Sequence, residues 1–247
     1  MKGHIDEVLL DEYLVHIYTP PVSVIDNELC PVLYVQDGSS LFLGSLDELE
    51  RCFATGELPR VVLVGIQPVN RLDDYTPWQA AALVEGRPAF GGGGDAYLEF
   101  MVTQIMPHVE AGYPVQTGPK HTGIIGASLG GLISMYAAFR YADVFGRIGS
   151  ISGSYWYPGM IEYVQSASNA AVTAGIHRFY VSVGTCEGEG KTNVQKDMVP
   201  LTLQVCDTLL AYGLTEREVR LVKDKGAVHN INHFRRQFPK AVEWLLG

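Results

Sequence analysis

The sequence predicts an α/β fold built on a mostly parallel, doubly wound sheet with helices on both faces. Short apolar runs with strand character alternate with longer segments of helical periodicity, which is typical of parallel sheets. The strand runs are uniformly apolar, as expected for strands that are covered on both faces. The chain has 247 residues, of which 47% are hydrophobic and 18% charged, so it can bury one large core. We therefore expect residues 1–247 to form a single domain.

Seven strands are expected along the chain. Residues 9–18 read as one early antiparallel strand that stops at two prolines. The other six are buried apolar runs at residues 31–36, 61–66, 121–127, 148–152, 179–184 and 218–222. Ligands bind beyond the carboxyl ends of the strands in such sheets. Polar residues that follow these strands are therefore candidates for one shared site.

Helical periodicity appears between the strands, at residues 46–52, 97–109, 132–141, 199–212 and 231–246. Residues 67–95 differ, because they contain three prolines and the glycine run 91–94 without a clear period. No Lys-Ser or Lys-Thr follows the glycines, so we interpret them as a flexible connection and not as a phosphate loop. A long irregular loop in a compact domain is usually functional. We expect this loop insertion to line the active site as a wall or lid.

The pentapeptide at residues 126–130, Gly-Ala-Ser-Leu-Gly, lies between a predicted strand and a predicted helix. This is the setting of a nucleophile elbow, in which Ser128 is exposed on a sharp turn at the edge of the sheet. The chain contains 27 glycines, so the pentapeptide alone does not establish this role. The alternative is a Gly-rich turn in which Ser128 only caps the helix.

A serine hydroxyl needs a base and an orienting carboxylate, which follow the serine along the chain in this fold. His229 follows the last predicted strand and is the expected base, with His233 as the fallback. Glu187 is the first carboxylate after the strand at 179–184 and is the expected acid. The acid could instead be Glu189, Asp197 or Asp224.

Two backbone amides should receive the oxyanion that forms during acyl transfer. One belongs to Leu129, the residue after the nucleophile. The other is expected in the loop after the strand at 31–36, where the Ser39 amide is the candidate. The alternative is that Asp37 and Gly38 only form a tight turn there.

Bulk properties exclude several classes of partner. The net charge of −9 argues against nucleic acid and against an anionic membrane surface. No signal peptide or membrane-spanning run is recognisable, and the four cysteines are widely spaced, so a cytoplasmic location with reduced thiols is expected. His229 and His233 have the i, i+4 spacing of metal ligands but lack the accompanying glutamate. Neither a metal nor another cofactor is expected.

Five short motifs, in this order along the chain, resemble the putative-esterase branch of the α/β-hydrolases, which includes esterase D-like, feruloyl and siderophore esterases. The motifs are P-V-L-Y-V-Q-D-G, G-A-S-L-G-G, S-G-S-Y-W-Y, V-G-T-C-E and G-A-V-H-N. The resemblance implies an α/β-hydrolase fold and a serine esterase with Ser128 as nucleophile and His229 as base. It also implies that Glu187 stands where relatives carry Asp or Glu, and that Trp156 and Tyr157 lie near the acyl pocket.

Residues 70–77, with the glycine run after them, look most like the short, single-domain siderophore esterases, which hydrolyse catecholate trilactones. This implies a small ester substrate, with a ferric siderophore as one candidate. Arg71 would be the cation for such a ligand, although a salt bridge within the loop is an equal alternative. Asp37 completes the candidate substrate-binding residues. A general carboxylesterase for small acyl or feruloyl-type esters is the competing interpretation, and a hydrolase-fold binding protein without catalysis is a third.

Overall fold

A computed structural model of the chain describes residues 2–21, 29–166 and 175–247. Its strands form one eight-stranded sheet in the order β1-β2-β4-β3-β5-β6-β7-β8. Along this order, all neighbouring strands from β4 to β8 are parallel. The pairs β1–β2 and β2–β4 are antiparallel. The strands are β1 (His4–Leu10), β2 (Tyr13–Thr19), β3 (Val32–Gln36), β4 (Val62–Ile66), β5 (Thr122–Ala127), β6 (Arg147–Ile151), β7 (Arg178–Gly184) and β8 (Val219–Asp224). The predicted fold class is confirmed.

The predicted single strand at residues 9–18 is wrong, because a turn divides this region into the hairpin of β1 and β2. Leu10 pairs with Tyr13, which leaves two residues in the turn. The first of them, Asp11, has a φ of 52°. Aspartate tolerates this left-handed conformation better than most residues do. The turn carries no Gly or Pro, so apolar patterning alone did not reveal it.

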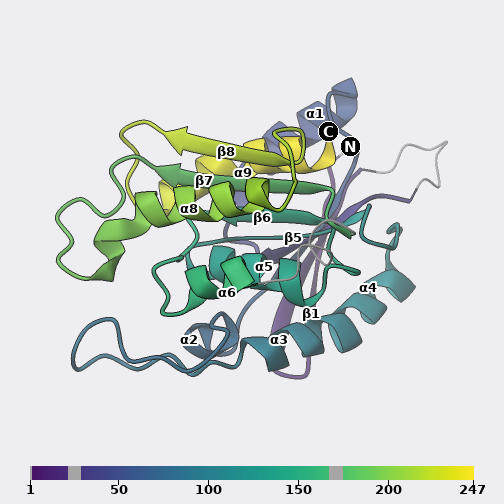
Figure 1. The fold of residues 1–247 in the computed structure, drawn as a ribbon. Helices are drawn as coiled ribbons and strands as arrows, with labels where there is room; N and C mark the ends of the chain where they lie inside the picture. Colours follow the sequence, from purple (N-terminus) through teal and green to yellow (C-terminus); the bar gives the residue numbers. More distant parts are fainter. Residues whose placement is uncertain (1, 22–28, 167–174) are drawn as a thin grey trace.

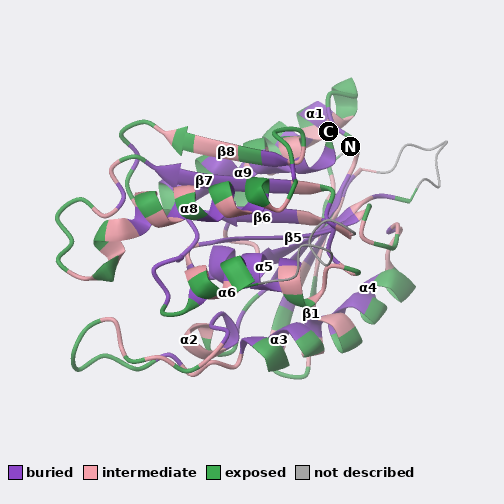
Figure 2. Cartoon of the chain, in the orientation of Figure 1, coloured by how far each residue is buried: buried purple, intermediate pink, exposed green. Residues whose placement is uncertain are grey.

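Helices cover both faces of the sheet (Figure 1), and alternate residues of the central strands enter two cores, one on each face. In β3, Tyr34 belongs to one core, whereas Leu33 and Val35 belong to the other. The smaller core is covered by α1 (Leu46–Thr55) and α9 (Ile231–Leu246). The larger is covered by α3 (Gly94–Phe100), α4 (Met106–Gly112), α5 (Leu129–Arg140), α6 (Met160–Ser166) and α8 (Met198–Ala211). Figure 2 shows the resulting pattern, with buried strands between helices whose outer faces are exposed.

Two helices differ from the sequence expectation by three residues at their start. The predicted helix at 97–109 extends from residue 94 to 112, as α3, the π-helix η2 (Met101–Ile105) and α4. The helix after the elbow begins at Leu129, three residues earlier than expected, and it is buried along almost its whole length. It therefore starts directly after Ser128, which is its N-cap. Within residues 2–21, 29–166 and 175–247, the two other short helical turns are η1 (Leu43–Ser45) and η3 (Val194–Asp197).

The segment 67–93 is more ordered than the expected irregular loop. It contains the short helix α2 (Arg71–Asp74) and an isolated bridge between Ala80 and Phe90. Trp78 ties it to the loop after β6, since its indole Nε1 donates to the Pro158 carbonyl at 2.7 Å. Gly92 has a φ of 74°, and a Cβ there would lie 2.2 Å from the carbonyl carbon of Trp78. The glycine run therefore permits close packing, which corrects the interpretation as a flexible connection.

Candidate active site

Ser128, Glu187 and His229 come together beyond the carboxyl ends of β5, β7 and β8. The His229 Nε2 atom lies 2.9 Å from the Ser128 Oγ, and its Nδ1 lies 2.8 Å from the Glu187 Oε2. The three side chains are thus linked by two hydrogen bonds across 101 and 42 residues of sequence. This is the arrangement that activates a serine nucleophile.

Ser128 occupies a strained turn that the two flanking glycines make possible. Its φ of 59° and ψ of −120° lie outside the regions that L-residues favour, at a cost of about 1–3 kcal/mol. A Cβ on Gly126 would lie 2.5 Å from the backbone of Gly130, and one on Gly130 would lie 2.9 Å from the Cβ of Gln36. The pentapeptide therefore forms the tight strand-to-helix turn of a nucleophile elbow.

Glu187 is buried, and its two carboxylate oxygens have separate partners. The Oε1 atom accepts from the Ser152 hydroxyl and from the Gly184 amide at 2.8 Å. The Oε2 atom faces His229. Burial alone would raise the pKa of Glu187, but the hydrogen bonds from His229, Ser152 and Gly184 outweigh it and hold the pKa below its ordinary value. The side chain is therefore a carboxylate at neutral pH.

Because Glu187 is ionised, His229 must carry a proton on Nδ1 to donate to it. The Nε2 lone pair then faces the Ser128 hydroxyl, as a general base requires. Phe234 packs edge-on against the His229 ring, with the ring centroids 4.9 Å apart. Asn230 follows His229 and is the N-cap of α9, because its side chain accepts from the His233 amide at 2.9 Å. The helix start and this aromatic contact together hold the loop that carries His229.

The loop after β3 places two residues in the left-handed region, with φ values of 65° at Asp37 and 63° at Gly38. The Asp37 amide donates to the Tyr75 hydroxyl at 2.7 Å, and the Gly38 amide donates to the Ile66 carbonyl at 2.9 Å. Within the described part of the chain, neither the Ser39 amide nor the Leu129 amide has an acceptor. Both amides can therefore still donate a hydrogen bond to a ligand oxygen.

Arg71 and Asp37 form a salt bridge, which was the alternative to ligand binding that the sequence suggested for Arg71. The Arg71 Nε and one terminal nitrogen donate to the two Asp37 oxygens at 2.7 and 3.1 Å. The same terminal nitrogen also donates to the carbonyl of Ala127, the residue before Ser128, at 3.2 Å. The Arg71 guanidinium also lies over the Tyr75 ring, 5.4 Å from its centroid. The pair thus joins α2, the loop after β3 and the nucleophile elbow.

Trp156 and Tyr157 are both buried in an aromatic cluster with the 67–93 segment. The Phe90 ring lies 6.0 Å from that of Trp156 and 5.2 Å from that of Tyr157, measured between centroids. The Tyr157 hydroxyl donates to the Trp78 carbonyl. That hydroxyl is therefore engaged by the protein, and both residues are part of the core, with 8% of Trp156 and 1% of Tyr157 exposed.

Sequence reasoning missed Ser152 and Ser154. Ser152 has a φ of 51° and binds Glu187 across 35 residues of sequence. The Ser154 amide donates to the Ser128 carbonyl, and its hydroxyl lies 3.4 Å from that of Ser128. Both belong to the S-G-S-Y-W-Y motif, whose position after a predicted strand was a signal for the site but not for these contacts.

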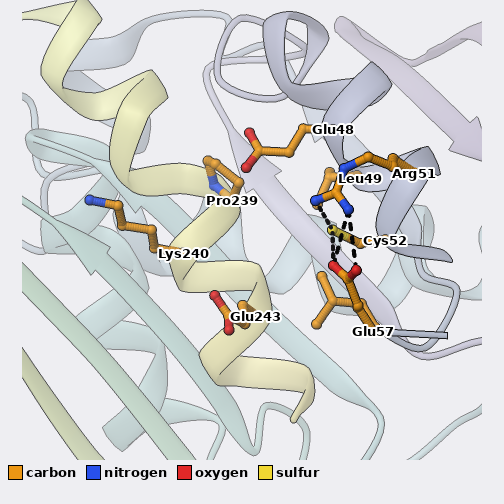
Figure 3. A pocket seen from close by; sticks show the side chains of 9 residues that line it. Glu48, Leu49, Arg51, Cys52, Glu57, Pro239, Lys240 and Glu243 are labelled. Atoms are coloured by element: carbon orange, nitrogen blue, oxygen red, sulfur yellow. Dashed lines mark hydrogen bonds and ion pairs between the residues drawn. The ribbon is translucent and has the colours of Figure 1, made fainter. Parts of the chain in front are cut away.

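A separate cavity of about 160 Å³ lies between α1 and α9 (Figure 3). It is lined by Glu48, Leu49, Arg51, Cys52, Glu57, Leu58, Pro239, Lys240 and Glu243. Burial and a hydrogen bond to Glu57 raise the pKa of the Cys52 thiol. Cys52 is therefore a protonated thiol at neutral pH, which is the unreactive form.

The mostly parallel sheet, with a serine on a strained turn after β5, defines an α/β-hydrolase. Residues 7–245 match the family described as "Putative esterase". The chain belongs to this family and is a carboxylic ester hydrolase. Across residues 2–21, 29–166 and 175–247, no helix is long and apolar enough to span a bilayer.

Individual proteins resemble this chain in sequence or in fold, over half of its length or more. The chain is 44% identical to the uncharacterized protein YbbA of Bacillus subtilis (strain 168), over 100% of this chain and 98% of that protein. It is 30% identical to a siderophore triacetylfusarinine C esterase of Aspergillus fumigatus, over 51% of this chain and 45% of that protein. The fold is similar to that of BES protein from Bacillus cereus, with a TM-score of 0.79, 18% identity and coverage of 100% and 97% of the two chains.

Proposed function

We propose that the protein is a serine esterase in which Ser128, His229 and Glu187 form the catalytic triad. The observation that carries this proposal is the continuous series of hydrogen bonds from Glu187 through His229 to the Ser128 hydroxyl, at 2.8 and 2.9 Å. The strained backbone of Ser128 supports it, because such strain clusters at functional sites.

In the proposed reaction, His229 Nε2 takes the proton of Ser128 as its Oγ attacks the ester carbonyl. The Ser39 and Leu129 amides receive the oxyanion of the tetrahedral intermediate, and Glu187 stabilises the imidazolium. His229 then returns the proton to the departing alcohol, which leaves an acyl-enzyme on Ser128. Water, activated by the same imidazole, hydrolyses this intermediate through the reverse sequence.

We further propose that the substrate is a siderophore whose lactone or ester bonds join catecholate units. Support for a siderophore substrate comes from the named activity of the Aspergillus fumigatus relative, a siderophore esterase that matches half of this chain. The catecholate units are carried over from the resemblance to siderophore esterases in the sequence. A general carboxylesterase is the second candidate, and the Arg71–Asp37 pair favours it because the Arg71 charge is already offset.

Ser128→Ala tests the proposed chemistry with p-nitrophenyl acetate as substrate. We expect kcat/KM to fall by roughly 10³-fold or more, because the acyl-enzyme cannot form. Ser154→Ala is the matched control, since it removes a neighbouring hydroxyl but not the nucleophile, and it should stay within about tenfold of wild type. Equal rates for Ser128→Ala and the wild-type protein would refute the serine mechanism.

The substrate class is tested separately, by comparing kcat/KM for enterobactin or bacillibactin with kcat/KM for methyl ferulate and short acyl esters. The siderophore proposal expects the trilactones to be preferred by at least about 10²-fold, which is a difference of about 2.7 kcal/mol in transition-state binding. A trilactone value no higher than that of the simple esters would favour the general carboxylesterase.

A further inference from the structure

Tyr75 is a completely buried tyrosine whose hydroxyl contacts the backbone of the loop that follows β3. Its oxygen accepts from the Asp37 amide at 2.7 Å, and its proton is donated to the Ile66 carbonyl at 3.3 Å. The Gly38 amide donates to the same carbonyl at 2.9 Å. Burial raises the pKa of Tyr75 well above its ordinary value, so the hydroxyl is neutral and can both accept and donate.

Asp37 depends on such contacts because its backbone is strained. Its φ of 65° lies in the left-handed region, which a non-glycine residue keeps only where its surroundings impose it. Two side chains of one short segment do so, since Tyr75 binds its amide and Arg71 binds both oxygens of its carboxylate. A phenylalanine at position 75 would leave the Asp37 amide facing a ring edge instead of an acceptor.

The segment that holds Asp37 also contacts the nucleophile elbow. Arg71 and Tyr75 are four residues apart, and the Arg71 guanidinium lies 5.4 Å from the centroid of the Tyr75 ring. Arg71 donates to the Ala127 carbonyl at 3.2 Å. A Cβ on Gly130 would lie 3.4 Å from the Asp37 Oδ2, so this carboxylate lies close to the elbow. The loop after β3 is therefore fixed relative to the elbow as well as to β4.

We propose that Tyr75 is a positioning residue of the esterase site, which holds the Asp37 amide and so fixes the direction of the Ser39 amide two residues later. The inference rests on the proposed serine mechanism, in which the Ser39 and Leu129 amides receive the oxyanion. An oxyanion forms only when Ser128 attacks the ester, so correct placement of the amide stabilises the transition state and not the bound substrate. Loss of the Tyr75 hydroxyl therefore lowers the rate of the chemical step.

Tyr75→Phe tests this role, because it removes the hydroxyl and keeps the ring. We expect kcat/KM for p-nitrophenyl acetate to fall by roughly tenfold or more. Tyr180→Phe is the matched control, since Tyr180 is also buried and its hydroxyl donates to the Gln237 Oε1 at 2.7 Å in the other core. It should lose a similar amount of stability in urea titration and keep kcat/KM within about twofold. A folded Tyr75→Phe whose kcat/KM is no lower than that of Tyr180→Phe would overturn the proposal.

Two inhibitors separate positioning from a general loss of packing. With phenyl trifluoromethyl ketone, the Ser128 Oγ bonds to the carbonyl carbon, its proton passes to the His229 Nε2, and the carbonyl oxygen becomes an oxyanion. The alcohol made by reducing this ketone has the same carbon skeleton and cannot react. We expect Tyr75→Phe to raise the Ki of the ketone by roughly tenfold and that of the alcohol by less than about twofold. Equal changes in the two Ki values would assign Tyr75 a purely structural role.

A measurement on the wild-type protein covers the case in which Tyr75→Phe fails to fold. The Asp37 amide should exchange its hydrogen as slowly as the amides of the central strands, because its acceptor is a buried hydroxyl. Exchange as fast as that of exposed loop amides would refute the positioning role. Ser128→Ala in the same assay separates the two levels. If it is inactive while Tyr75→Phe retains its kcat/KM, only the positioning role fails, and if it is fully active, the serine mechanism itself fails.

Discussion

Glu187→Gln is expected to lower kcat/KM by roughly 10³–10⁴, because it reverses the tautomer of His229. The glutamine carbonyl oxygen must take the place of Oε1, since the Ser152 hydroxyl and the Gly184 amide both donate there. The amide nitrogen then faces His229 Nδ1, now 2.8 Å from a donor instead of an acceptor. His229 must move its proton to Nε2, which removes the lone pair that faces Ser128.

The size of this effect follows from the burial of the site. Turning the amide over would place its N–H groups against two donors inside the protein, which costs about 1–3 kcal/mol for each unsatisfied group. The unproductive tautomer therefore dominates. A loss of 10³–10⁴ corresponds to about 4–5.5 kcal/mol of transition-state stabilisation. Glutamine has almost the same volume as glutamate, so we expect the protein to remain folded.

The assay is p-nitrophenyl acetate hydrolysis near neutral pH, with thermal unfolding measured in parallel. Glu189→Gln is the matched control, because it makes the same chemical change two residues later at an exposed position, and it should leave kcat/KM within about twofold. If Glu187→Gln retained more than roughly a tenth of wild-type activity while folded, Glu187 would not be the triad acid.

Three further outcomes are expected. Gly126→Ala should destabilise the protein by about 1–3 kcal/mol in urea titration, since its Cβ would lie 2.5 Å from the Gly130 backbone; unchanged stability would contradict the elbow packing. Arg71→Met should lower kcat by roughly tenfold even for a neutral ester, if its role is to hold Asp37 beside the oxyanion loop; an effect on KM for anionic esters alone would assign it to substrate binding. Burial lowers the pKa of His233 below its ordinary 6.5, so the unfolded chain binds this proton more readily. The free energy of unfolding should therefore fall as the pH drops below about 6.5, and His233→Gln should lack that part of the fall when urea titrations are compared across this range; identical pH profiles would contradict it.

The parallel part of the sheet could be predicted because its strands from β3 to β7 are almost wholly buried, mostly apolar runs. The strand predicted at 179–184 is β7, and the helix predicted at 231–246 is α9 with the same bounds. The N-terminal hairpin could not be predicted, because its turn at Asp11 and Glu12 contains neither Gly nor Pro. The order of the 67–93 segment also escaped prediction, since it depends on tertiary contacts of Trp78 with a loop 80 residues away.

The members of the candidate triad could be predicted from chain order, since each follows a strand whose end lies at the same rim. The side chains that contact these three residues could not be predicted in the same way. Ser152 reaches Glu187 only because β6 and β7 are neighbours in register. His233 could be identified as a fallback base, yet its position behind Glu187 depends on where α9 begins. Side-chain pairing across distant segments is a property of packing, and residue spacing does not encode it.

The charges around Ser128 bear on which ester the site accepts. The net charge of the chain is −9, and the Arg71 guanidinium beside the elbow is bound to both oxygens of Asp37. An anionic ferric complex would have to compete with Asp37 for this cation, which costs part of its binding energy. An uncharged ester meets no such cost. If the substrate is a siderophore, its uncharged parts are therefore better suited to provide recognition than its charge.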